Sequence, residues 1–96
     1  MDVNIQAINF DATEKLNEFI NKKVNRLARH YPDITTVEVK LTVVKPESAM
    51  NKEVVITAIE PKNEFVATKI ADTFEEAIDL SLEAIDKMAE KAKAKK

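Results

Sequence analysis

The lysine and arginine residues of this chain are spaced in a way that could serve a chemical function. That function is the binding of phosphate groups. On a helical wheel, four cations between residues 12 and 30 fall within about 60° of arc: Lys15, Lys22, Arg26 and Arg29. Lys23 extends that arc on one side. Cations gathered along one helix face match the spacing at which side chains follow a nucleic-acid backbone. The same pattern is also typical of a solvated helix face, so the pattern alone leaves both interpretations open.

A second group of lysines lies at the end of the chain, at Lys87, Lys91, Lys93, Lys95 and Lys96. It follows the stretch 72–86, which holds six acidic residues and no basic one. Lysines near the end of a helix and acids near its start both interact favourably with the helix dipole, whatever the function. The lysine group therefore predicts either a further RNA contact or an ordinary helix end. The acids are expected to surround a solvated helix face, without the donor geometry of a metal site.

The composition excludes most catalytic sites. The chain has no cysteine, so thiol nucleophiles and cysteine-based zinc sites are ruled out, and its one histidine cannot build a multi-histidine metal site. No serine, cysteine or second histidine is placed to form a catalytic triad with His30. It has no glycine, which removes the glycine-rich loops that hold nucleotide phosphates. We expect no enzyme, no cofactor, no metal and no small-molecule substrate.

Hydrophobic periodicity predicts the elements that must position these cations. Alternating apolar residues predict strands over 2–9, 36–44, 53–60 and 65–70, and apolar stripes predict helices over 12–30 and 73–92. Asp11 as the cap with Glu14 behind it marks the start of the first helix, and Pro32 ends it. Thr73 and Glu76 form a capping box at the start of the second.

This element order, βαβββα, predicts the α+β class: a four-stranded sheet with both helices packed on one face. With 96 residues, 45 % of them hydrophobic, and no linker or repeat, the chain is expected to form a single domain over residues 1–96. Eight residues are expected in the core: Leu16, Ile20, Val24, Leu27, Phe74, Ile78, Leu82 and Ile85. The other sheet face is left open. The run 54–56 is apolar on both sides, so the inward faces of the strands 53–60 and 65–70 stay ambiguous.

The N-terminus lacks the basic stretch and apolar run of a signal peptide, and no stretch approaches the roughly 18 apolar residues of a membrane helix. We therefore expect a cytoplasmic protein that does not bind membranes.

Residues 3–6 and 10–20, together with Lys23, Arg26 and Leu27, resemble the ribosome hibernation-promoting factor family, also called ribosome-associated inhibitors or sigma-modulation proteins. The segment 71–79 is similar to the family's aspartate-x-aromatic opening of the last helix. The resemblance covers the whole chain, and it implies a fold like a double-stranded-RNA-binding domain with an added strand. The chain is similar to a short form, because the dimerisation domain of the longer members is absent.

The resemblance implies that the protein occupies the mRNA and tRNA channel of the small ribosomal subunit and contacts 16S rRNA. We expect the free protein to be a monomer. Such binding silences idle ribosomes and favours their dimerisation, without chemistry. The family's basic positions carry over to Lys23 and Arg26, and beyond them to Lys22 and Arg29. The last helix departs from the family, since many members have an arginine-rich run where residues 86–89 here read Asp-Lys-Met-Ala.

A second interpretation is a protein-interaction module. In it, the open sheet face or the acidic second helix binds a protein, and the first helix is merely solvated. The net charge of −2 favours this alternative, because a free RNA-binding protein usually carries an excess of bases.

Overall fold

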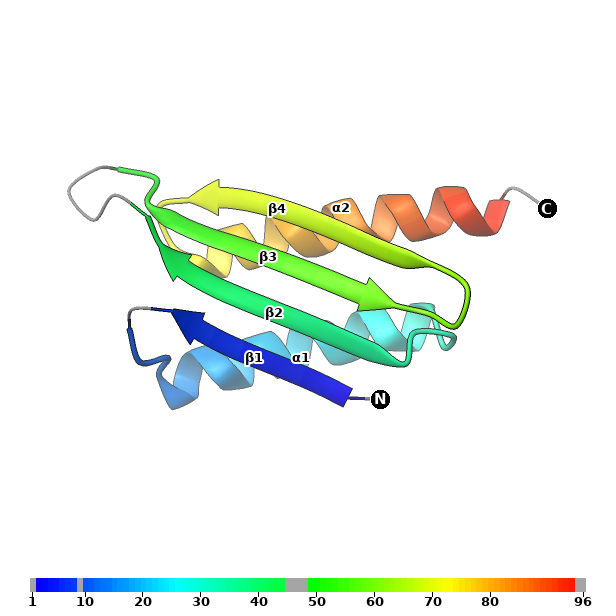
Figure 1. The fold of residues 1–96 in the computed structure, drawn as a ribbon, viewed down its shortest axis with the longest axis horizontal. Helices are drawn as coiled ribbons and strands as arrows, with labels where there is room; N and C mark the ends of the chain where they lie inside the picture. Colours follow the sequence, from blue (N-terminus) through cyan, green and yellow to red (C-terminus); the bar gives the residue numbers. More distant parts are fainter. Residues whose placement is uncertain (1, 9, 45–48, 95–96) are drawn as a thin grey trace.

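Four strands and two helices make up the part of the chain that the computed structural model describes, residues 2–8, 10–44 and 49–94 (Figure 1). In chain order they are β1 (Asp2–Ile8), α1 (Glu14–His30), β2 (Thr36–Val43), β3 (Lys52–Ile59), β4 (Glu64–Ala71) and α2 (Phe74–Ala94). The predicted element order and the α+β class are both confirmed.

The strands lie side by side in the order β1-β2-β3-β4. β1 runs parallel to β2, with Asp2 opposite Thr36 and Ile8 opposite Thr42. A parallel pair needs a crossover connection, and α1 provides it. β3 and β4 continue the sheet with antiparallel pairing.

Both helices cover the same face of the sheet, α1 beside the β1–β2 half and α2 beside the β3–β4 half (Figure 1). Their apolar stripes and the inward residues of the strands form one core. Seven of the eight residues expected there are buried: Ile20, Val24, Leu27, Phe74, Ile78, Leu82 and Ile85. The eighth, Leu16, is half-buried and packs against the others.

The sequence leaves the inward faces of β3 and β4 ambiguous, and the register of β3 with its neighbours decides both. Ile56 pairs with Val39 of β2 and with Ala67 of β4, and all three residues are buried beneath the helices. Val55, one residue earlier, points to the opposite, open face and is half-buried. Side chains of a strand alternate between faces, so this register fixes the direction of every β3 side chain.

Threonine hydroxyls begin both helices. The Leu16 backbone N–H donates to Thr13 Oγ1 at 3.1 Å, so Thr13 is the cap of α1 and the prediction of Asp11 was wrong. Thr13 is the residue with extended backbone directly before the first helical turn, which brings its hydroxyl to that N–H. At α2 the Glu76 N–H donates to Thr73 Oγ1 at 3.1 Å, as the capping box predicts. Relative to prediction, α1 starts two residues later and α2 ends two residues later.

Candidate nucleic-acid interface

The outward face of α1 carries a row of free cations. Burial of Ile20, Val24 and Leu27 against the core fixes the rotation of the helix, so the opposite side faces solvent. Three cations and one amide on that side line a shallow surface hollow of about 260 Å³: Lys22, Arg26, Arg29 and Asn25. All four residues are exposed, and the three cations form no ion pair within the described part of the chain. We call Lys22, Arg26 and Arg29 the α1 cation row.

Lys15, two turns earlier on the same helix, is exposed but lies apart from this row. It lines a separate hollow of about 480 Å³ with Thr13, Leu16, Phe19 and Glu75. Lys15 thus points to the same side of α1 as the cation row, as the helical wheel predicts. Its surroundings differ, because they include Glu75 of α2. It extends the row along the helix without joining the same hollow.

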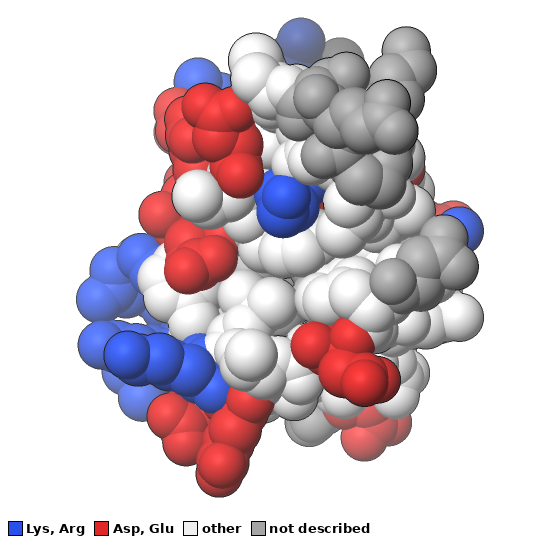
Figure 2. Space-filling model, turned by 90° about the vertical axis from the view of Figure 1, so that its left-hand side faces the viewer, with Lys and Arg blue, Asp and Glu red and all other residues white. Residues whose placement is uncertain are grey.

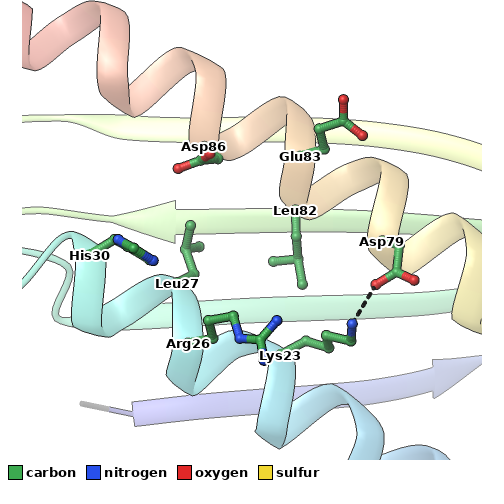
Figure 3. Close-up of a pocket in the computed structure, with 8 residues that line it drawn as sticks. All are labelled: Lys23, Arg26, Leu27, His30, Asp79, Leu82, Glu83 and Asp86. Atoms are coloured by element: carbon green, nitrogen blue, oxygen red, sulfur yellow. Dashed lines mark ion pairs between the residues drawn. The ribbon is translucent and has the colours of Figure 1, made fainter.

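Lys23 points along the molecule's surface toward α2 rather than outward. Its ammonium lies 3.4 Å from an Oδ1 of Asp79 and 5.4 Å above the ring centroid of Phe19, and 31 % of its side chain is exposed. Figure 3 shows the lysine reaching across a groove of about 280 Å³ between the two helices. Among the predicted site residues on α1, Lys23 is the one that forms an ion pair with a carboxylate of the described residues.

That groove has basic side chains on one wall and acidic side chains on the other. Lys23, Arg26 and His30 come from α1, above an apolar floor of Leu27 and Leu82. The facing wall on α2 presents three acids: Asp79, Glu83 and Asp86. The end-on view in Figure 2 shows basic side chains gathered on the left of the molecule, with acidic side chains both above and below them.

Tyr31 connects the two walls at the end of the groove. Its hydroxyl lies 2.7 Å from Asp86 Oδ1, to which it donates, and 3.1 Å from the Asp86 carbonyl oxygen. The hydrogen bond to the carboxylate, with smaller effects of burial and of the charges of Asp86 and Glu90, raises the pKa of Tyr31 to about 12. Tyr31 also ends α1, where its N–H donates to the Leu27 carbonyl at 3.1 Å. A single residue therefore caps one helix and anchors the other.

The lysines of α2 are mostly engaged with carboxylates. Lys87 lies 3.3 Å from Glu83, one turn earlier. Lys93 lies 3.0 Å from Asp33 and 3.1 Å from Glu60, whose side chain is only 3 % exposed. Hydrogen bonds to Asp33 and then to Glu60 raise the pKa of Lys93. Lys91 is exposed, and Lys95 and Lys96 lie outside the described residues.

The structure therefore separates the cations that the sequence grouped. Lys22, Arg26 and Arg29 come together and face outward, whereas Lys23, Lys87 and Lys93 each face an acid. Sequence reasoning missed Asp33, Glu60 and Tyr31, because they meet α2 from 33 to 60 positions away. No periodicity within one helix signals such contacts.

The open sheet face, the surface of the alternative interpretation, mixes polar and apolar side chains. Lys40, Thr57 and Thr68 lie on it together with Val66 and Ile70, which are 48 % and 41 % exposed. Within residues 2–8, 10–44 and 49–94, no cluster of His, Asp or Glu could hold a metal ion. No helix in those ranges is long and apolar enough to cross a membrane.

Comparison with known proteins agrees with this architecture. Residues 3–96 match the family model described as "Sigma 54 modulation protein / S30EA ribosomal protein". The chain is 32 % identical to a "Ribosome hibernation promoting factor" of Azotobacter vinelandii, covering 99 % of this chain and 85 % of that protein. It is 30 % identical to the protein of the same name from Pseudomonas putida, covering 99 % and 89 %.

Two solved structures share the fold. A ribosomal subunit interface protein from Coxiella burnetii superposes with a TM-score of 0.88 at 21 % identity, covering 99 % of this chain and all of that one. The N-terminal domain of Thermus thermophilus Protein Y superposes with a TM-score of 0.79 at 17 % identity, covering 95 % and 98 %.

Proposed function

The chain belongs to the Sigma 54 modulation protein / S30EA ribosomal protein family, and on that premise we propose that it holds idle ribosomes in hibernation by binding 16S rRNA of the small subunit. Family members of this kind are ribosome-associated and non-enzymatic. The whole chain, residues 1–96, acts as one ribosome-binding domain and reaches the ribosome as a monomer. It occupies the channel used by mRNA and tRNA. Translation stops because mRNA and tRNA cannot enter the channel while the protein fills it.

The α1 cation row is the observation that carries this proposal. Lys22, Arg26 and Arg29 are exposed, face one hollow and are free of ion pairs within the described residues. When such side chains neutralise RNA phosphates, the counterions bound to the RNA are released, which favours binding. A folded surface of this kind recognises structured RNA through the phosphate backbone and the shape of the RNA. Lys15 extends the contact along the helix. Lys23, which the sequence also predicts to contact RNA, is held by Asp79 and adds a contact only when that ion pair opens.

Co-sedimentation with purified small ribosomal subunits on sucrose gradients tests the proposal. Three to four phosphate contacts predict that log affinity falls with log salt at a slope of about −3 to −4. Binding with no such slope would contradict an RNA contact. It would favour the protein-interaction module, in which the exposed Val66 and Ile70 of the open sheet face contact a protein.

A further inference from the structure

Each acid on the α2 wall of the groove contacts one other side chain. Asp79 lies 3.4 Å from Lys23, Glu83 lies 3.3 Å from Lys87, and Asp86 accepts the Tyr31 hydroxyl at 2.7 Å. We call Asp79, Glu83 and Asp86 the α2 acid row. It spans two turns of α2 along the whole groove (Figure 3).

The position of the acid row limits where a phosphate backbone can lie. Arg26 lines both the groove and the outer hollow, so the α1 cation row and the acid row border the same narrow surface. Charges that lie closer than the Debye length, about 8 Å at physiological salt, interact without full screening. A phosphate that entered the groove would meet the carboxylates of Asp79 and Asp86, and it would have to displace Asp79 from Lys23 to gain that lysine. The Glu83 carboxylate points away from the groove and pairs with Lys87 (Figure 3).

We infer that the α2 acid row is a specificity determinant: it confines RNA to the outward side of α1 and suppresses binding to RNA other than the ribosomal site. This inference rests on the proposed function and adds what the acids of α2 do for it. When Asp79 holds Lys23, a random RNA duplex gains fewer phosphate contacts at the groove. Non-specific affinity is almost entirely electrostatic, so it falls with each phosphate contact that is lost. The ribosomal site, which also fits the shape of the fold, retains its affinity.

The acids of the open sheet face provide a matched control. Glu38, Glu53 and Glu64 lie on three strands, on the sheet face opposite the helices. The variants D79N/E83Q/D86N and E38Q/E53Q/E64Q therefore change the net charge equally, but only the first changes the groove. A third variant, D79N/E83Q, leaves the Tyr31–Asp86 hydrogen bond in place and covers the case in which the triple groove variant is poorly folded.

The experiment measures the affinity of each folded variant for two probes, an RNA duplex of arbitrary sequence and purified small ribosomal subunits, across a salt series. In the groove variants Lys23 and Lys87 are released, so duplex affinity rises by about tenfold or more and the salt slope steepens by about two. Subunit affinity rises much less, so the preference for the subunit falls. The sheet-face variant changes duplex affinity by about threefold at most, with an unchanged slope.

Equal duplex affinities and slopes for the groove and sheet-face variants would overturn the inference, because net charge alone would then explain them. An equal gain in affinity for the duplex and for the subunit would overturn the inference as well. The acids would then lower the affinity for all RNA without favouring the subunit. Failure of the proposed function has a different signature. There, the unmodified protein itself would not bind the subunit, whatever the duplex measurements give.

Discussion

The outward side of α1 and the C-terminal half of α2 hold similar numbers of cations, yet the structure treats them in opposite ways. On α1, Lys22, Arg26 and Arg29 share one hollow and stay free of ion pairs within the described residues. On α2, Lys87 and Lys93 are both held by carboxylates. The difference teaches that the number of lysines in a segment does not measure its capacity to bind phosphate. The carboxylates beside each lysine decide it, whether they come from the same helix, as for Lys87, or from distant elements, as for Lys93.

Both helices pack on one hydrophobic core. The prediction with the largest expected effect tests whether they share it. Ile20 is fully buried where α1 meets the sheet. Ile20→Ala should lower the free energy of unfolding by about 2–5 kcal/mol, because it leaves a cavity. Urea unfolding followed by circular dichroism measures the loss. Separate unfolding of the two helices in this variant would contradict a shared core.

The next prediction sharpens the contrast within α2. Lys93→Gln removes the ammonium that faces the buried carboxylate of Glu60, so the urea midpoint should fall clearly. Lys91→Gln, at an exposed lysine two residues earlier, should change stability by about 0.5 kcal/mol at most. Equal urea midpoints for the two variants would show that the ion pairs of Lys93 with Asp33 and Glu60 add no stability.

A smaller effect concerns the tyrosine that joins the helices. Tyr31→Phe should cost about 0.5–1.5 kcal/mol at neutral pH, because one hydrogen bond to Asp86 is lost. The pKa of Tyr31 is raised from 10.0 to about 12, so the folded state holds this proton more tightly than the unfolded state does. The resulting stability is present below pH 10 and is lost as the pH rises toward 12.

Unfolding midpoints of both proteins across that pH range check the sign. The unmodified protein should lose stability more steeply than Tyr31→Phe, while the raised pKa of Lys93 acts equally in both. Parallel curves would show that the Tyr31 hydroxyl does not hold α2 against α1.

Much of the fold was predictable because local patterns report it. The stripe Ile20, Val24 and Leu27 fixed the buried side of α1, and Pro32 fixed its end. The apolar run 54–56 could not reveal its inward face, since that depends on pairing with Val39. Thr13 and Asp11 are both good caps, and only the backbone conformation separates them.

The candidate site was predictable on α1 and not between the helices. A helical wheel shows that Lys22, Arg26 and Arg29 share a side, because that side is a property of one segment. It cannot show that Lys23 meets Asp79, or that Lys93 meets Asp33 and Glu60, since those contacts depend on how distant elements pack. The sequence therefore predicted the cations, and the packing of α1, α2 and the strands determined which of them remain free.

Two charge reversals of equal size test most directly whether α1, rather than the end of α2, carries the RNA contact. Lys22→Glu with Arg26→Glu changes the α1 cation row, and Lys87→Glu with Lys91→Glu makes the same change of net charge on α2. Affinity for purified small ribosomal subunits, measured on folded proteins at fixed salt, should fall about 100-fold or more for the first pair and about threefold at most for the second. Equal losses for the two pairs, or a full affinity in the α1 variant, would contradict the account.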